Sequence, residues 1–388
     1  MRVLVVPKWY PWPGRPVLGI FCQEQARALA SRHDVVVLAS DAVRSPDFAA
    51  FQLTDGVEDG LRTIRLRYRR PRFRPAAMAC QLAGMLAALR TLRREGWRPE
   101  VVHAHVYSAG LPALVLGPLS GAPVVVSEHF TGFQRGLITG YDRLTARIAF
   151  RFADLVAPVS EDLARQVRAL QPRARVRVVG NVVDTAVFHP PAEGGPRSAA
   201  ADRPARLLTV AAFAPKKAHT DLLEALAELR PKRDVTLELV GEGDTRRRVA
   251  ARARELGLGD AVTFRGEQPK DRVAELMRQA DLFVLPSVFE NLPCVLIESL
   301  ASGLPFVATA VGGVPELVDG PGGVLSPPGD PRALAAAIET ALDQREQVDP
   351  QALADRAQRR FGYETFERTW TAIYDELRAG RVISRIGA

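Results

Sequence analysis

Residues 281–318, which read DLFVLPSVFENLPCVLIESLASGLPFVATAVGGVPELV, constrain the fold more than any other stretch of the chain. DLFVLPS and LPFVATAV are short, apolar, β-branched runs of strand length. Between them, CVLIESLASG has helical spacing and ends at Gly303. GGVPELV then predicts a turn into a further helix. This order of elements predicts parallel strands joined by right-handed crossovers.

Two carboxylates of this stretch, Glu290 and Glu298, follow the first strand, one in the loop and one in the first turns of the helix. In an open α/β sheet, ligands bind beyond the carboxyl ends of the strands. The free N–H groups of a helix N-terminus favour phosphate, whereas carboxylates accept hydrogen bonds from hydroxyls. Phosphate beside hydroxyl-binding acids is the chemistry of a sugar nucleotide. The alternative is that both glutamates are solvated acids favoured by the helix dipole.

The spacing of Glu290 and Glu298, the LPS before them and the GGVPELV after them resemble the donor site of retaining GT-B glycosyltransferases of family 4, also called glycosyl transferases group 1. The resemblance extends over nearly the whole chain. It implies an α/β fold with two Rossmann-like, doubly wound parallel-sheet domains facing a central cleft. It also implies that Glu290 holds sugar hydroxyls and that Glu298 holds ribose hydroxyls, with the loop residues Asn291, Leu292 and Pro293 in the donor site.

The chain of 388 residues is long enough for two domains. A stretch rich in Pro, Gly and Ala, residues 191–205, predicts a linker or surface loop. NVVDTAVFHP, which precedes it, fits the pattern with which the family closes its first domain. We therefore place an acceptor-side domain at 1–190 and a nucleotide-sugar-binding domain at 191–365. The resemblance implies that the C-terminal helix, 366–388, crosses back to the first domain.

In the first domain, the strand RVLVVP leads through a Pro/Gly-rich loop to a helix that begins just after Gly19. The resemblance implies that this loop faces the donor diphosphate, although an ordinary strand-to-helix turn explains the glycine equally well. His105 and His129 stand at the ends of two further strands. His129, in SEHF, matches the position where the family places a histidine close to the donor sugar. We interpret His103 and His105 as cleft or structural residues.

The second domain opens with a strand, the loop APKKAH and a helix. Lys216 and Lys217 lie at this strand-to-helix junction, where a lysine pairs with a diphosphate as a point charge. The family pattern has an arginine about five residues before the lysine, but Ala212 occupies that position here. Half of the usual diphosphate clamp is therefore missing. The loop that starts at Arg265 and Gly266 is where such enzymes hold the nucleobase.

Basic residues are concentrated in the first half of the chain, because residues 1–180 carry a net charge of +12 and the remainder −4. Residues 62–75 contain seven arginines and no acid, and an apolar helix-like stretch follows. This combination suits an anionic membrane surface or a phosphate-bearing acceptor. A solvated strand beside a core helix is the structural alternative. Nucleic acid is a weaker interpretation, because no base-stacking platform accompanies the arginines.

Several protein classes are disfavoured. Cys22, Cys80 and Cys294 are odd in number and far apart, which indicates a reducing compartment and no metal cluster. No signal peptide and no run of about 18 apolar residues is evident, so we expect a cytoplasmic protein or one peripheral on the inner face of a membrane. The chain contains no D-x-D motif, which argues against a bound metal, and no G-x-G-x-x-G follows its first strand, which argues against a dehydrogenase.

These patterns and the family resemblance together predict a metal-independent hexosyltransferase without a cofactor, which moves a sugar from a nucleotide-diphosphate donor to a glycan or lipid-linked acceptor. The resemblance implies that the enzyme is retaining. Polysaccharide, glycolipid or other envelope-glycan assembly is the expected setting. Glu290 and His129 are the candidate catalytic residues, and no acceptor-binding residue is assigned. Two alternatives stay open: a nucleotide-sugar-binding subunit without transfer activity, which Ala212 favours, and a nucleotide-sugar epimerase of the same architecture.

Overall fold

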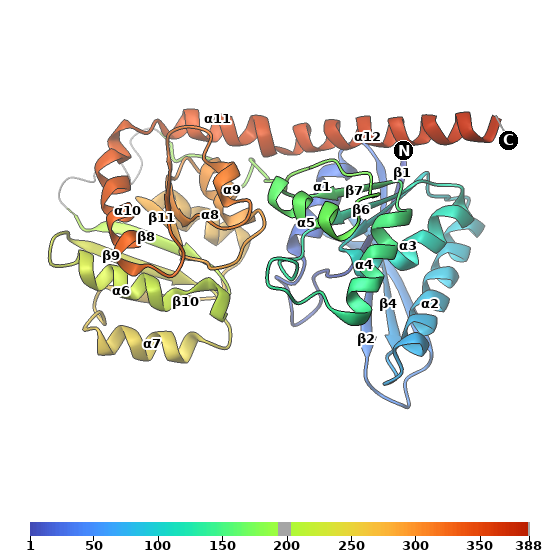
Figure 1. The fold of residues 1–388 in the computed structure, drawn as a ribbon, viewed down its shortest axis with the longest axis horizontal. Coiled ribbons are helices and arrows are strands. Elements are labelled where there is room, and N and C mark those ends of the chain that lie inside the picture. Colours follow the sequence, from blue (N-terminus) through green and yellow to red (C-terminus); the bar gives the residue numbers. More distant parts are fainter. Residues whose placement is uncertain (193–202, 387–388) are drawn as a thin grey trace. The chain divides into compact units, whose positions relative to one another are not determined.

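The computed structural model describes residues 1–192 and 203–386 and divides into two compact units (Figure 1). The first unit comprises Met1–Val182 together with Phe366–Ala388, and the second comprises Val183–Thr365. The boundary therefore falls at Val182, whereas the sequence suggested 190/191. Most of the predicted linker, residues 193–202, lies outside the described part of the chain.

The first unit contains a seven-stranded sheet in the order β3-β4-β2-β1-β5-β6-β7. Every neighbouring pair is parallel except β3 and β4. The strands are β1 (Arg2–Pro7), β2 (Asp34–Val43), β3 (Phe51–Glu58), β4 (Leu61–Arg69), β5 (Val101–His105), β6 (Val124–Glu128) and β7 (Leu155–Pro158). The helices are α1 (Ile20–Ala30), α2 (Arg74–Arg94), α3 (Tyr107–Ser120), α4 (Gly140–Phe152), α5 (Glu161–Leu170) and α12 (Tyr363–Ile386), whose residues from Phe366 onward belong to this unit.

The second unit contains a six-stranded, all-parallel sheet in the order β10-β9-β8-β11-β12-β13. Its strands are β8 (Ala205–Val210), β9 (Val235–Val240), β10 (Val262–Gly266), β11 (Leu282–Leu285), β12 (Phe306–Thr309) and β13 (Gly323–Ser326). The α-helices are α6 (His219–Leu229), α7 (Arg246–Glu255), α8 (Lys270–Gln279), α9 (Cys294–Ala301), α10 (Pro331–Gln344) and α11 (Pro350–Phe361). Three short 3₁₀ helices, η2 (Pro215–Lys217), η3 (Val314–Leu317) and η4 (Arg345–Gln347), complete the described elements.

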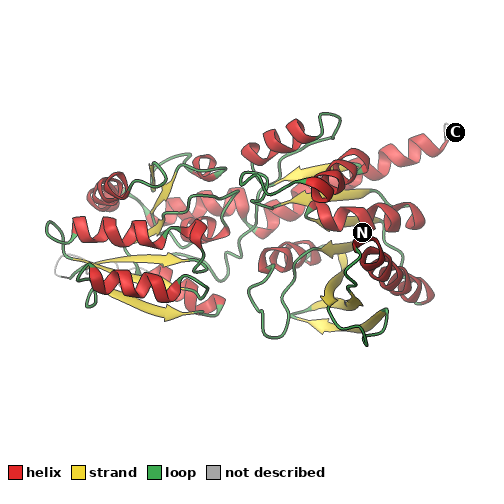
Figure 2. Ribbon diagram, turned by 60° about the horizontal axis from the view of Figure 1, so that its bottom comes forward, coloured by secondary structure: helices red, strands yellow, loops and turns green. Residues whose placement is uncertain are grey.

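The central strands of both sheets are buried along their whole length, as expected where helices cover both faces (Figure 2). All residues of β5, β6, β11 and β12 are buried. The predicted α/β fold with two doubly wound parallel sheets is therefore confirmed.

Each sheet has one topological switch point. There, one chain connection leads from the first strand of the sheet to a neighbour on one side, and a later connection leads to the neighbour on the other side. In the first unit the chain proceeds from β1 to β2 and later returns to β5 on the other side of β1. In the second unit it proceeds from β8 to β9 and later returns to β11 on the other side of β8. In open α/β sheets, ligands bind at such a switch point, beyond the carboxyl ends of the strands.

The stretch 281–318 forms β11, α9 and β12 as predicted, but GGVPELV does not form a full helix. It yields only the four-residue η3, because the following VDGPGG contains three glycines and a proline, which do not continue a helix. After α5, Val176 forms only an isolated bridge with Val156. Ser160 caps α5, because its hydroxyl accepts the Leu163 N–H at 3.2 Å.

Helix α2 bears on whether the chain contains a membrane-spanning segment. By length and composition it is apolar enough to cross a membrane, contrary to the expectation that no such segment exists. A core helix passes the same test, and Met85, Ala88, Leu89 and Leu92 of α2 are buried in the core of the first unit. The helix is therefore weak evidence for a membrane span.

Candidate active site

The loops at the carboxyl edge of the second sheet are joined to one another by main-chain hydrogen bonds. The links, from β10 to β12, are Gly241 N–H to Gly266 O (2.8 Å), Phe213 N–H to Glu242 O (2.9 Å), Val288 N–H to Lys216 O (2.8 Å) and Gly313 N–H to Asn291 O (2.7 Å). Each bond connects the loops of neighbouring strands, so the edge forms one continuous backbone platform. A platform of this kind holds side chains at fixed positions.

Lys217 and Glu290 meet at the switch point of this platform. Lys217 follows β8, Glu290 follows β11, and the lysine Nζ donates a hydrogen bond to Oε1 of the glutamate. Their side chains are only 14% and 7% exposed, so both charges have lost most of their hydration. A desolvated pair costs free energy unless the partners satisfy each other, and an anion or a hydroxyl arriving from solution can compete for either one.

The other predicted donor-site residues of this region follow Glu290 in the β11–α9 loop and in α9. Asn291 and Leu292 are buried, Pro293 caps α9, and Glu298 is half-buried in the second turn of the helix. The sequence did not single out Ser287, whose buried hydroxyl oxygen has no hydrogen-bond partner among the described residues. Buried polar atoms are nearly always satisfied, so an orphaned hydroxyl at the strand end is a position where a ligand can bond.

His219, the first residue of α6, is a second polar group that sequence reasoning missed. Its ring is buried and stacked on Phe213, with centroids 4.4 Å apart and planes 12° apart. Neither ring nitrogen has a hydrogen-bond partner within the described part of the chain. Burial, assisted by the charge of Lys217, lowers the pKa of His219 to about 4. The ring is therefore a neutral donor and acceptor beside the lysine at neutral pH.

The other predicted residues of the second unit have more ordinary surroundings. The guanidinium of Arg265 forms a bidentate ion pair with Glu238 at 3.0 Å, so its side chain is already occupied. Gly266 uses its carbonyl in the platform described above. Ala212 is exposed, as is appropriate for a loop position that could carry a longer side chain. Lys216 is half-buried and bonds the β11 loop through its main chain.

In the first unit, Gly19 is required by packing within its own loop. Its φ of 73° is left-handed, and a Cβ at this position would lie 2.2 Å from the carbonyl oxygen of Trp9. Any side chain would therefore push the β1–α1 loop apart. This close contact alone accounts for a glycine at position 19, so no bound ligand is needed to explain it. The contact also fixes the loop beside the N-terminus of α1.

Three histidines form a stacked row at the carboxyl ends of β5 and β6. Ring centroids are 4.6 Å apart for His103 and His105 and 5.4 Å apart for His105 and His129. His103 bonds Tyr374 of α12 (2.6 Å) and Ser127 (2.7 Å), which gives it a structural role. Burial lowers the pKa of His105 to about 3 and that of His129 well below its usual value, so the row is neutral.

Glu128 anchors this row, although the sequence analysis did not assign it a role. Its carboxylate accepts the N–H groups of Tyr107 (2.8 Å), His129 (2.9 Å) and Phe130 (2.9 Å). Burial raises the pKa of Glu128 to about 7, against the effect of the three hydrogen bonds. The acid thereby holds the turn after β6 and the backbone of His129 in place.

The arginine run of residues 62–75 divides into two parts. Antiparallel strand β3, which the sequence analysis did not predict, brings acids opposite the first part. Asp55 pairs with Arg62, and Glu58 pairs with Arg65. Arg62 and Arg65 therefore have acidic partners supplied by the neighbouring strand, and the membrane or phosphate interpretation of the run concerns the arginines that follow them.

A metal site was not expected from the sequence. Within residues 1–192 and 203–386, no three His, Cys, Asp or Glu side chains are grouped so that they could hold a metal ion.

Comparison with known proteins agrees with this architecture. Residues 18–187 match the family described as Glycosyltransferase Family 4, and residues 196–360 match Glycosyl transferases group 1. Glycogen synthase of Mycobacterium tuberculosis (strain CDC 1551 / Oshkosh) is 31% identical over 377 residues, which cover 92% of this chain and 88% of that protein. The D-inositol 3-phosphate glycosyltransferase of Acidothermus cellulolyticus is 30% identical over 349 residues, covering 84% and 78% respectively.

Solved structures show the same fold. Sucrose-phosphate synthase from Thermosynechococcus elongatus superposes with a TM-score of 0.80 at 23% identity, covering 98% of this chain and all of that one. Anabaena HepE in complex with UDP-glucose superposes with a TM-score of 0.73 at 21% identity, covering 97% and 100%. Two doubly wound units, two family matches and relatives that align over almost the full length lead to one conclusion: the chain belongs to the GT-B glycosyltransferases of family 4, the glycosyl transferases group 1.

Proposed function

We propose that the chain is a retaining, metal-independent enzyme that moves a sugar from a nucleotide-diphosphate donor to a glycan or lipid-linked acceptor. The observation that carries the proposal is the Lys217–Glu290 pair at the switch point of the second sheet. The ammonium group of Lys217 suits a diphosphate, and the carboxylate of Glu290 suits sugar hydroxyls.

In this proposal the donor separates the pair. The diphosphate takes over the ammonium of Lys217, with Lys216 nearby, and negative charge that develops on the leaving group is stabilised there. Glu290, released from the lysine, accepts hydrogen bonds from the sugar, and Glu298 accepts them from the ribose. The main chain of residues 291–293 and 265–266 and the loop at Gly19 complete the donor site.

The reaction breaks the bond between the anomeric carbon and the phosphate oxygen and forms a bond between that carbon and the acceptor oxygen. The acceptor attacks on the face that the diphosphate leaves, and a phosphate oxygen takes the acceptor's proton. The configuration at the anomeric carbon is then retained. His129, neutral because of burial, contributes a hydrogen bond to the sugar rather than a charge.

Metal independence is supported by the absence of D-x-D and by the lysine, which supplies the positive charge that a metal would otherwise supply. The names of the relatives favour a hexose donor and a polysaccharide or phosphorylated acceptor. We also propose a cytoplasmic location, peripheral to the inner face of the membrane if the acceptor is lipid-linked.

Ala212 is the one observation that favours a second function, a nucleotide-sugar-binding subunit without transfer. Such a subunit would bind the donor but release no nucleoside diphosphate when acceptors are added. An epimerase would convert the donor in the absence of any acceptor. The same experiment separates these outcomes.

The test begins with a melting-temperature screen against UDP-, GDP-, ADP- and dTDP-sugars, since a ligand at 100 times its Kd stabilises the folded state by about 2.7 kcal/mol. The stabilising donor is then incubated with candidate acceptors, and NMR of the product gives the anomeric configuration. Glu290→Ala should abolish transfer, whereas Glu228→Ala, which removes an exposed acid of α6, should not. An inverted product, or full activity of the Glu290 variant, would contradict the proposal.

A further inference from the structure

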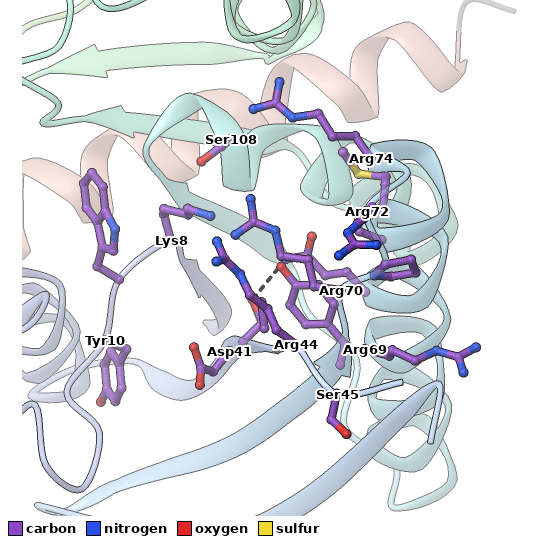
Figure 3. A pocket seen from close by; sticks show the side chains of 18 of the residues that line it. Lys8, Tyr10, Asp41, Arg44, Ser45, Arg69, Arg70, Arg72, Arg74 and Ser108 are labelled. Carbon is purple, nitrogen blue, oxygen red and sulfur yellow. Dashed lines mark hydrogen bonds between the residues drawn. The ribbon is translucent and has the colours of Figure 1, made fainter. Parts of the chain in front are cut away.

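A cavity of the first unit lies at the switch point of its own sheet (Figure 3). It has a volume of about 1230 Å³, which exceeds the roughly 300–1,000 Å³ of ordinary small-molecule pockets. Lys8 after β1, Asp41 in β2, Arg70 after β4 and Ser108 in α3 line it. The cavity therefore occupies the position where a doubly wound sheet binds its ligand.

The lining of this cavity is strongly basic. Two acids contribute to it, Asp41 and Asp142. The basic side chains are Lys8, Arg15, Arg44, Arg69, Arg70, Arg72 and Arg74. Even with both acids ionised, the wall carries five more positive than negative charges.

Most of these basic side chains have no acid within ion-pair distance among the described residues, although Asp142 and Asp41 act on Lys8 from farther away. The side chains of Lys8, Arg44, Arg70 and Arg72 form no hydrogen bond or ion pair with any of the described residues. Arg74 is 3.7 Å from Asp142, at the outer range of an ion pair. The contrast with the first half of the same arginine run is clear, because those arginines are paired with acids of β3.

The side chains are also aimed at a common region. In Figure 3 Lys8, Arg44 and Arg70 extend into the same side of the pocket, whereas Arg69 points away from it. Desolvation by the pocket walls, and next the charge of Arg70, lower the pKa of Lys8. Like charges that converge in a partly desolvated wall repel one another, and a bound anion relieves that repulsion.

We propose that this cavity binds the phosphate group of the acceptor, with Lys8, Arg44 and Arg70 as its ligands. The inference rests on the proposed function and names the acceptor's chemical class: a sugar or polyol that carries a phosphate ester. Guanidinium groups match phosphate oxygens two at a time, which lysine alone cannot do. Trp9 and Trp12, both half-buried, add aromatic side chains to the wall, against which the C–H face of a sugar ring can pack.

The test measures binding to the full chain at low salt, without donor. The probes are a hexose 6-phosphate, the same hexose without phosphate, and inorganic phosphate. Binding of each probe is measured by titration calorimetry or by the shift in melting temperature. A second arm measures co-sedimentation with phosphatidylglycerol vesicles and with phosphatidylcholine vesicles. Arg70→Gln and Arg44→Gln are compared with Arg67→Gln, which removes an equal charge from an exposed position of β4 outside the cavity.

We expect the phosphorylated hexose to bind at least tenfold more tightly than the free hexose, since charge-assisted hydrogen bonds are the strong ones. Arg70→Gln and Arg44→Gln should each weaken this binding about tenfold, and Arg67→Gln less than twofold. Binding to anionic vesicles with the same dependence on Arg70 and Arg44 would also support a phosphate site, and would assign it to a lipid headgroup. If the binding of neither the hexose phosphate nor the anionic vesicles depends on Arg70 and Arg44, the inference is wrong. It is also wrong if Arg67→Gln weakens binding as much as Arg70→Gln and Arg44→Gln do.

The donor provides an independent check. Affinity for the nucleotide sugar should be unchanged in Arg70→Gln, because Arg70 is not among the residues of the proposed donor site. If donor affinity falls together with hexose-phosphate affinity, the cavity belongs to the donor diphosphate and the acceptor proposal is overturned. If no donor binds the wild-type chain but hexose phosphate still does so through Arg70, the proposed function fails while the phosphate site stands.

Discussion

The buried pair of Lys217 and Glu290 gives the sharpest test of the donor site. We consider three variants, Lys217→Met, Glu290→Gln and the double variant, which keep side-chain size while removing the charges. With exposures of 14% and 7%, both side chains are close to fully desolvated. Removing one partner of a buried pair costs about 3–5 kcal/mol, because the other charge stays buried without compensation. We take about 3 kcal/mol for Lys217→Met, since the site opens to solvent.

For a domain of this size, about 1 kcal/mol corresponds to roughly 2–4 °C in Tm, so Lys217→Met should melt about 6–12 °C lower. The double variant should be more stable than the sum of the two single effects predicts, by about 1–3 kcal/mol. Differential scanning calorimetry is the appropriate assay, because it resolves the transitions of the two units. Transfer activity should fall at least tenfold in all three variants, which remain folded.

Two results would refute this reasoning in different ways. Strictly additive effects on Tm would mean that the two side chains are not coupled in solution, whatever their positions. Wild-type turnover in Lys217→Met would mean that the lysine does not stabilise the leaving group. If the effects of the two substitutions on stability are coupled but the variants keep their activity, the pair has a structural role only.

Three further predictions concern other features. His219 has a pKa of about 4 in the folded chain against about 6.5 unfolded, so the stability of the second unit should fall as the pH drops from 6.5 to 4, by up to about 3 kcal/mol. His219→Phe, which keeps the stack on Phe213, should remove this contribution from the calorimetric transition of the second unit between pH 4 and 8, while the buried histidines of the first unit keep theirs. Gly19→Ala should lower the melting temperature of the first unit by several degrees, because the new methyl group meets the Trp9 carbonyl; an unchanged calorimetric transition would show that the loop adjusts freely. Prolonged dialysis against EDTA should leave transfer within twofold of the untreated enzyme, and recovery on adding Mg²⁺ or Mn²⁺ would disprove metal independence.

The fold was accessible from the sequence because its signal is local. Strand-length apolar runs that alternate with helical spacing, as in residues 281–318, predict a doubly wound sheet regardless of distant contacts. The GT-B family could be recognised from the same stretch. The short η3 shows the limit of this reasoning, because the turn residues that follow it stop a helix which the pattern itself allows.

Features that depend on pairing between distant segments could not be predicted in this way. Strand β3 is half-exposed and polar, so its sequence carries little strand signal, yet its acids neutralise Arg62 and Arg65. His219 looked like an ordinary first residue of a helix, and only its stack on Phe213 shows that it is buried and unpartnered within the described part of the chain. A single sequence contains no signal for either contact.

Helix α12 has a consequence for how the protein is made. Trp370 and Tyr374, two of the largest fully buried side chains, lie in the first unit, and Tyr374 bonds His103 of β5. A ribosome that has delivered Met1–Val182 must therefore translate all of Val183–Thr365 before it supplies these side chains. The later half of the polypeptide can reach its native state first, while the earlier half waits with an uncovered apolar surface where a chaperone can act.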